Sequence, residues 1–325
     1  MGTNKMDAIG IGRCCVDVIL NIPTAIKENS TAVISQKSVQ GGGKSATAAA
    51  TLAKLGASAG FVGVVGSDQA GDFCFHDLQR LGVDTSQMIA DEGKSSGISI
   101  VISDQEKFAR NILCVPSSCR KIQIDDIREE YIKNAGILFL ESQSCPIDVS
   151  IHCARIAKKH GLTTIFDGDA YEENQKELLP FIDVFIGSEH YYTSVFKDQN
   201  HDTNCRQFMK AGPRIVVFTF GAKGCSGCEG DHSFHIPAFR VEVSDTLGAG
   251  DVFHGAFAYG LLKQWSPYET ARFASAVSAI KCTRIGGRAG IPSVRNVMEF
   301  MKTGRIDYTE IDNEVVYYAN QKSFF

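Results

Sequence analysis

Six short apolar runs, separated by segments with helical periodicity, constrain the fold of this chain most. They cover residues 8–12, 60–66, 136–140, 163–167, 183–187 and 215–220, and they are apolar throughout, as strands of a parallel sheet covered on both faces are. Between two of them, Val149, Cys153 and Ile156 recur at helical spacing before Gly161, a residue suited to ending a helix. This alternation predicts an α/β fold with a doubly wound, mostly parallel sheet and helices on both faces.

A second kind of segment interrupts this pattern. Residues 16–22, 31–39 and 97–103 alternate apolar and polar side chains, which is typical of strands with one face in solvent. No linker rich in Pro, Gly or Ser divides the sequence. We therefore expect a single domain over residues 1–325 that carries a small β lid, built from about residues 13–40 and 95–116.

Composition narrows the class of protein. A formal net charge of −4 over 325 residues argues against nucleic-acid partners, and no run approaches the roughly 20 apolar residues that span a bilayer. The 11 cysteines are an odd number scattered along the chain, which suits reduced thiols in a cytoplasmic protein. Cys225 and Cys228 have the spacing of half a zinc site or a redox pair, but no second such pair accompanies them, so we expect a structural role.

Residues 245–251 suggest a catalytic loop, because two glycines surround Ala249 and an apolar helical run follows Asp251. Glycines let the backbone turn tightly, and the amides of Gly248, Ala249 and Gly250, with the positive end of the helix dipole, form a cradle for an anion. Asp251 lies at its edge, where a carboxylate takes a proton from a hydroxyl that attacks a phosphoryl group. The alternative is a plain turn in which Asp251 caps the helix.

A second glycine segment, residues 40–45, copies the end of a phosphate-binding P-loop at Gly43, Lys44 and Ser45. The first glycine of that motif is missing, because position 38 is Ser38. The segment before it also looks like a solvent-facing strand and not a buried one. We therefore do not expect a true P-loop at Lys44.

Together these segments resemble the signatures of the pfkB, or ribokinase-like, family of sugar and nucleoside kinases, over about residues 9–292. The resemblance implies that Asp251 is the catalytic base and that Gly248 to Gly250 form the anion hole. It implies a sugar-binding set, in which Thr47 stands where many members have Asn. That set comprises Asp17, Gly42, Gly43, Lys44 and Thr47.

The resemblance also implies where ATP and metal ions bind. The nucleotide-contacting residues would be Ser188, Thr219, Gly221, Lys223, Gly224 and Gly286. Asp245 and the carbonyl group of Leu247 fall where ribokinase-like members hold a monovalent cation, which implies K⁺. The family's Asn-x-x-Glu motif is altered here, and Glu189 is the residue left to reach Mg²⁺ through water.

The activity implied is transfer of the γ-phosphoryl group of MgATP to a hydroxyl of a small carbohydrate. Residues 41–47, 188–189 and 281–292 are similar to a subgroup that contains sulfofructose kinase and ketohexokinase-like proteins, which points to a ketose or a 6-substituted ketose. Lys94, Lys107 and Arg110 lie in or near the lid, where they would meet an anionic group on the sugar or serve as plain surface.

Two alternatives stay open, and one partner is expected. A nucleoside kinase of the same fold would need an aromatic slot for a base, and the lid supplies few aromatic residues beyond Phe108. A non-catalytic sugar sensor would explain the altered motif at residues 188–191, although the intact 245–251 loop argues against it. We also expect a homodimer formed through the lid.

Overall fold

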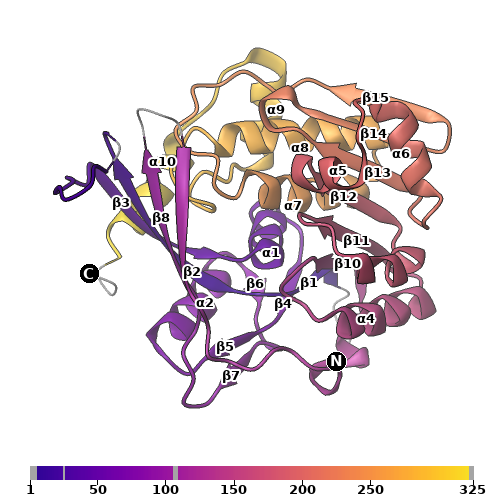
Figure 1. The fold of residues 1–325 in the computed structure, drawn as a ribbon, viewed down its shortest axis with the longest axis horizontal. Helices are drawn as coiled ribbons and strands as arrows, with labels where there is room; N and C mark the ends of the chain where they lie inside the picture. Colours follow the sequence, from indigo (N-terminus) through magenta and orange to yellow (C-terminus); the bar gives the residue numbers. More distant parts are fainter. Residues whose placement is uncertain (1–5, 25, 105–108, 322–325) are drawn as a thin grey trace.

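A large, mostly parallel sheet forms the centre of the protein (Figure 1). The computed structural model describes residues 6–24, 26–104 and 109–321. The strand order is β15-β14-β13-β12-β11-β10-β1-β4-β6, with antiparallel pairing only at β13-β14-β15. The strands are β1 (Met6–Ile11), β4 (Ala59–Val62), β6 (Val83–Asp84), β10 (Ala135–Glu141), β11 (Thr163–Gly168), β12 (Val184–Ser188), β13 (Ile215–Thr219), β14 (Cys225–Glu229) and β15 (His232–Ile236).

The expected α/β fold with a mostly parallel sheet is confirmed, and two details differ. The run 60–66 is two strands, β4 and β5 (Val64–Gly66), and β5 pairs with β7 (Ile89–Asp91) in a separate two-stranded sheet. The break falls at Gly63, where a Cβ atom would lie 2.6 Å from the carbonyl oxygen of Gly12. The antiparallel strands β14 and β15 escaped prediction because Gly, Cys, Ser and His residues give them no clear apolar pattern.

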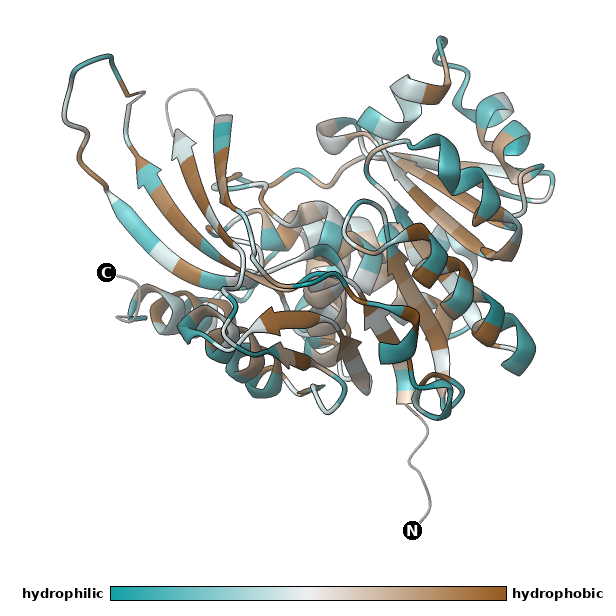
Figure 2. Ribbon diagram, turned by 60° about the horizontal axis from the view of Figure 1, so that its bottom comes forward, coloured by the Kyte–Doolittle hydropathy of each residue, from teal (hydrophilic) through white to brown (hydrophobic). Residues whose placement is uncertain are grey.

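A smaller sheet, with order β3-β2-β8-β9, projects from the rest of the molecule (Figure 2). Its strands are β2 (Cys15–Ile22), β3 (Gln36–Gly42), β8 (Ile98–Asp104) and β9 (Ala109–Val115). The expected strand at 31–39 is wrong in its first half, because β3 begins only at Gln36, the partner of Asn21 near the end of β2. β3 instead continues to Gly42, so the glycine segment begins inside the sheet.

Helices cover both faces of the large sheet (Figure 1). Alternate residues of β10 belong to different hydrophobic cores: Ile137 and Phe139 lie in the core that also contains residues of α1, α7 and α8, whereas Leu138 and Leu140 lie in the core that contains residues of α4 and α6. The helices are α1 (Lys44–Lys54), α2 (Gln69–Arg80), α3 (Glu129–Ile132), α4 (Ile147–His160), α5 (Glu189–Val195), α6 (His201–Met209), α7 (Ala249–Leu262), α8 (Pro267–Lys281), α9 (Val294–Thr303) and α10 (Thr309–Ala319), with short 3₁₀ turns at Ile124–Asp126, Glu173–Glu177, Leu179–Phe181 and Gly221–Lys223.

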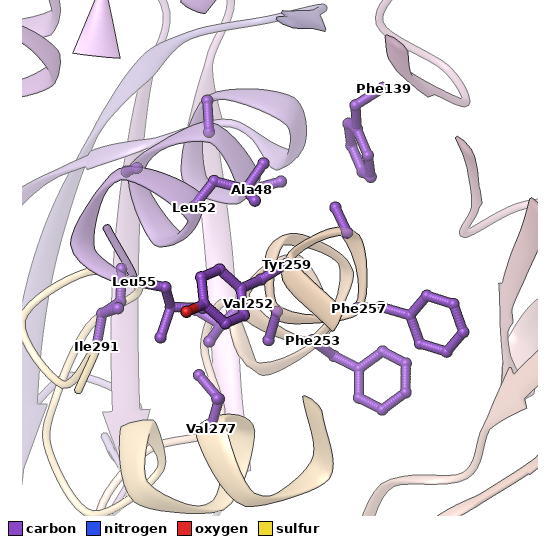
Figure 3. Close-up of a cluster of buried hydrophobic side chains, with 14 of the residues drawn as sticks. Ala48, Leu52, Leu55, Phe139, Val252, Phe253, Phe257, Tyr259, Val277 and Ile291 are labelled. Atoms are coloured by element: carbon purple, nitrogen blue, oxygen red, sulfur yellow. The ribbon is translucent and has the colours of Figure 1, made fainter. Parts of the chain in front are cut away.

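The packing of α1 against α7 positions the glycine segments relative to each other (Figure 3). Small residues allow the close approach: a Cβ atom on Gly255 would lie 2.5 Å from the carbonyl oxygen of Ala48. Around this contact, Leu52 of α1 and Val252 of α7 pack in one cluster with Val277 of α8. The two helices that follow the glycine segments therefore belong to one rigid core.

The cysteines are unpaired, and no helix of the described residues is suited to spanning a membrane. All 11 cysteines are free thiols. Cys225 and Cys228 lie on opposite faces of β14, one in each hydrophobic core, so they do not form a pair of ligands. The helices within residues 6–24, 26–104 and 109–321 are too short or too polar to cross a bilayer.

Candidate active site

The loop at residues 245–251 ends in a helix N-terminus, as expected. Gly248 precedes α7 in the left-handed region (φ 72°), and a Cβ atom there would lie 2.8 Å from Cα of Gly287. Position 248 therefore favours glycine for both its conformation and its space. Asp251 lies in the first turn of α7, where main-chain amides and the helix dipole favour negative charge.

The side chain of Asp251 has the electrostatics of a base that works near neutral pH. Burial raises its pKa to about 6, and the negative charge of Asp167 adds to this effect, while Lys44 and His254 oppose it. Its carboxylate is thus largely ionised at pH 7 and able to accept a proton. A capping carboxylate on the surface would show no such environment.

Asp17 lies on β2 beside the glycines of β3. A Cβ atom on Gly42 would lie 2.4 Å from Oδ2 of Asp17, so the main chain approaches this carboxylate closely. Burial raises the pKa of Asp17 to about 6, whereas the Arg288 guanidinium lowers it and the Asp251 charge raises it. Because the two carboxylates influence each other, they face the same region.

Lys44 follows Gly43, whose positive φ of 95° places it against the carbonyl oxygen of Arg13. The Lys44 ammonium forms an ion pair with Asp169 (Nζ to Oδ2, 2.8 Å) and lies 3.4 Å from Oε1 of Gln143. Burial alone lowers the pKa of Lys44, but neighbouring carboxylates, Asp167 first, raise it above the usual value. Lys44 is therefore a cation among acids at the end of β11.

Glu141 was missed by sequence reasoning. It ends β10, is only 1% exposed, and accepts hydrogen bonds from the main-chain N–H groups of Arg13 (3.0 Å) and Ser45 (2.6 Å) and from the Ser45 hydroxyl (2.7 Å). It thereby joins the two segments that carry Asp17 and Lys44. A signal existed, because Glu141 and Asp167 each close a predicted parallel strand, and ligands bind beyond the carboxyl ends of such strands.

Thr47 was expected to contact the sugar, but its side chain is buried and bonded to Arg288. It is 1% exposed, and its hydroxyl oxygen accepts a hydrogen bond from Nε of Arg288 (3.3 Å). The same guanidinium donates to the carbonyl oxygen of Gly42 (3.0 Å) and to Oδ2 of Asp77 (2.7 Å). Thr47 thus supports the glycine segment through Arg288, a residue for which the sequence carried no signal.

Most of the expected nucleotide residues lie at the carboxyl ends of β12 and β13 or in the turn after β13. Ser188 and Thr219 are direct partners at the ends of β12 and β13. Gly221 (φ 54°) and Gly224 (φ 92°) shape the turn after β13. Gly286 (φ 86°) lies in the loop after α8, against the side-chain amide of Gln40.

The two expected metal positions are already engaged by nitrogen donors. Glu189 forms an exposed ion pair with Lys223 (Oε1 to Nζ, 3.0 Å). Asp245 accepts hydrogen bonds from the main-chain N–H groups of Leu247 (2.9 Å) and Gly286 (2.8 Å).

The cationic residues expected in or near the lid lie in different places. Arg110 of β9 donates a hydrogen bond to the hydroxyl of Thr246, and so links the small sheet to the loop that precedes α7. Lys94 lies in the turn between β7 and β8 and is exposed. Lys107 and Phe108 lie outside the described residues.

Comparisons with known proteins agree with this geometry. Residues 7–294 match the pfkB family carbohydrate kinase profile. The chain is 28% identical to 5-dehydro-2-deoxygluconokinase of Clostridium perfringens, over 94% of this chain and 96% of that protein. A ribokinase of Arabidopsis thaliana solved with ribose and ATP has a TM-score of 0.77 at 25% identity, covering 91% of this chain and 99% of the other. A putative ribokinase II of E. coli solved with ATP and Mg²⁺ has a TM-score of 0.80 at 20% identity, covering 91% and 99% of the two chains. The chain belongs to the pfkB family of carbohydrate kinases and is a phosphotransferase that acts on a sugar hydroxyl.

Proposed function

We propose that this kinase transfers the γ-phosphoryl group of MgATP to a hydroxyl of a small ketose that carries an anionic group. The observation that carries the proposal is that Asp17 lies against Gly42 and Asp251 lies in the first turn of α7, and that the packing of α1 against α7 holds these two glycine segments together. Burial raises the pKa of both carboxyls to about 6. One carboxylate is suited to binding sugar hydroxyls and the other to removing a proton.

In this mechanism Asp17 and the main chain at Gly42 hold the acceptor sugar. Asp251 accepts the proton of the attacking hydroxyl, and the amides of Gly248 to Gly250 stabilise the charge on the transferred group. ATP supplies the phosphoryl group and lies against Thr219, Gly221 and Gly224. The small sheet acts as a lid that keeps water from competing for that group.

Arg13 supports an anionic acceptor. It is exposed in the segment between β1 and β2, and Cys15 first, then Cys114 and Asp17, raise its pKa above the usual value. Among the described residues no carboxylate forms an ion pair with it. A relative is named as a kinase of 5-dehydro-2-deoxygluconate, a keto sugar acid. A sugar carboxylate beside Arg13 would find the partner that the chain itself does not provide.

A coupled assay of ADP release tests this proposal over a panel of ketohexoses, pentoses, their 6-phosphates, keto sugar acids and nucleosides. We expect the highest kcat/KM with an anionic ketose. In the Arg13→Met variant the KM for that acceptor should rise while the KM for neutral ketoses stays unchanged. Arg305→Met, at an exposed position after α9, is the matched control. Preference for a nucleoside, or equal loss for neutral and anionic sugars, would contradict the proposal.

We further propose that Glu189 holds Mg²⁺ through water when its exposed ion pair with Lys223 opens.

We also propose that a second copy of the chain covers the lid. Apolar side chains of the small sheet and its loop are exposed, among them Val33 (74%), Leu113 (54%) and Val115 (49%). Leu113→Asp should convert a dimer to a monomer in light scattering, and a wild-type protein that is already monomeric would refute the dimer.

The free thiols support a cytoplasmic location.

A further inference from the structure

Asp245, one of the two residues expected to hold the family's monovalent cation, is already engaged by nitrogen donors. K⁺ is bound in proteins by oxygen atoms that replace its hydration shell. Both carboxylate oxygens of Asp245 already accept main-chain hydrogen bonds, Oδ1 from Leu247 (2.9 Å) and Oδ2 from Gly286 (2.8 Å). The main-chain carbonyl oxygen of Asp245 accepts a third one, from Nζ of Lys281 (2.9 Å).

Lys281 is the last residue of α8 and its side chain is completely buried, with 0% exposure. Lysine is almost never buried in this way unless its charge has a partner. In the described parts of the chain no carboxylate lies within ion-pair distance of its ammonium, whose one hydrogen-bond acceptor is the carbonyl oxygen of Asp245. A monovalent ammonium therefore occupies the neighbourhood in which a monovalent metal ion would be expected.

The position of this ammonium is fixed by the chain around it. The main-chain N–H groups of Ser244 and Asp245 both donate to the carbonyl oxygen of Cys282, at 2.8 and 3.1 Å. The Ser244 hydroxyl donates to the carbonyl oxygen of Thr283 (2.9 Å). These bonds join the segment before the anion loop to the segment after α8, and Lys281 lies where the two meet.

We propose that the Lys281 ammonium takes the place of the monovalent cation, so that this kinase works without K⁺. Lys281 is a positioning residue: its ammonium holds the carbonyl group of Asp245. The Asp245 carboxylate in turn holds the main-chain amides of Leu247, which precedes the 248–250 loop, and of Gly286, in the segment after α8. A metal ion would add a second positive charge beside a buried cation, which is unfavourable.

The test compares potassium chloride with choline chloride at equal ionic strength, in sodium-free buffer. Phosphoryl transfer and thermal unfolding are measured for the wild type, for Lys281→Ala, and for Lys302→Ala at an exposed position of α9 as the matched control. Unfolding requires no sugar, so the result does not depend on the identity of the acceptor. We expect the wild type and Lys302→Ala to behave alike in both salts. Lys281→Ala should have a lower Tm and rate in choline and regain part of both in potassium, because K⁺ enters the space left by the ammonium.

A wild type that K⁺ activates or stabilises relative to choline overturns the inference. So does a folded Lys281→Ala protein that shows no difference between the salts. If Lys281→Ala does not fold, the wild-type comparison still decides, since it needs no variant.

Discussion

Replacing Arg288 with Met tests how the glycine segment at residues 40–45, which we propose binds the sugar, is held in place. The guanidinium is fully buried, as is its partner Asp77 (0% and 1% side-chain exposure), and they are joined at 2.7 Å. The Met side chain fills similar space but removes that ion pair and the hydrogen bonds to Gly42 (3.0 Å) and Thr47 (3.3 Å). Breaking a buried ion pair by removing one partner costs about 3–5 kcal/mol, because the other charge stays buried. We expect the free energy of unfolding to fall by about this much.

Denaturant unfolding measures the effect, and a double-mutant cycle separates it from a general loss of packing. Arg288→Met combined with Asp77→Leu should cost less than the sum of the single changes, because the double variant buries no unpaired charge. Arg214→Met is the control: Arg214 pairs with Glu229 at 3.1 Å on the surface, and such pairs contribute about 0–1 kcal/mol. If Arg288→Met cost no more than Arg214→Met, or if the two buried changes were additive, the reasoning would fail.

Three further changes test the site. Asp251→Asn should reduce kcat at least ~10²-fold with ATP binding retained, since the amide cannot accept a proton. Folding raises the pKa of Asp251 from 3.8 to about 6, so the protonated carboxyl stabilises the fold below pH 3.8 and this contribution is lost as pH rises through 6. The Asn variant should therefore unfold at a higher temperature than the wild type at pH 7, but not at pH 3.5. Asp167→Asn removes the charge that most raises the pKa of Asp251, and the acid limb of the kcat profile should move below about 6; an unmoved limb would refute Asp251 as the titrating base. Lys44→Ala should leave ATP affinity unchanged in calorimetric titration and weaken sugar use, because Lys44 pairs with Asp169 after β11, whereas the proposed nucleotide residues Ser188 and Thr219 end β12 and β13. A collapse of ATP affinity would restore the P-loop interpretation.

Much of the fold was predictable because its signals are local. The parallel strands are buried on both faces and read as unbroken apolar runs, and the C-terminal end of α4 at Gly161 follows from a residue that adopts a positive φ of 70°. Strands β14 and β15 were not predictable, since their stability comes from pairing with β13 and from packing against α6 and α8. The start of β3 at Gln36 depends on where β2 ends, which is a property of the pair.

The site divides in the same way. Glycine-rich loops and the acids beside them carry their own pattern, which is why Asp17 and Asp251 could be proposed from the sequence. Glu141 had only its place at the end of a predicted strand as a signal. Nothing in the sequence predicted that Arg288, Lys281 and Glu141 are buried, because a charged residue is usually exposed, and only the tertiary structure shows their burial.

The hydrogen bonds that hold the glycine segment extend to the C-terminal helix α10, which lies beyond the residues of the family match. The family match ends at residue 294, yet Tyr318 of α10 donates a hydrogen bond to Oδ1 of Asp77 at 2.7 Å. Asp77 pairs with Arg288, and Arg288 holds the carbonyl oxygen of Gly42. Because each link is a buried hydrogen bond, we expect a change at Tyr318 to reach the glycine segment at Gly42 without touching any residue of the signature. The geometry of the proposed acceptor site therefore depends on a part of the chain that the shared family pattern does not describe.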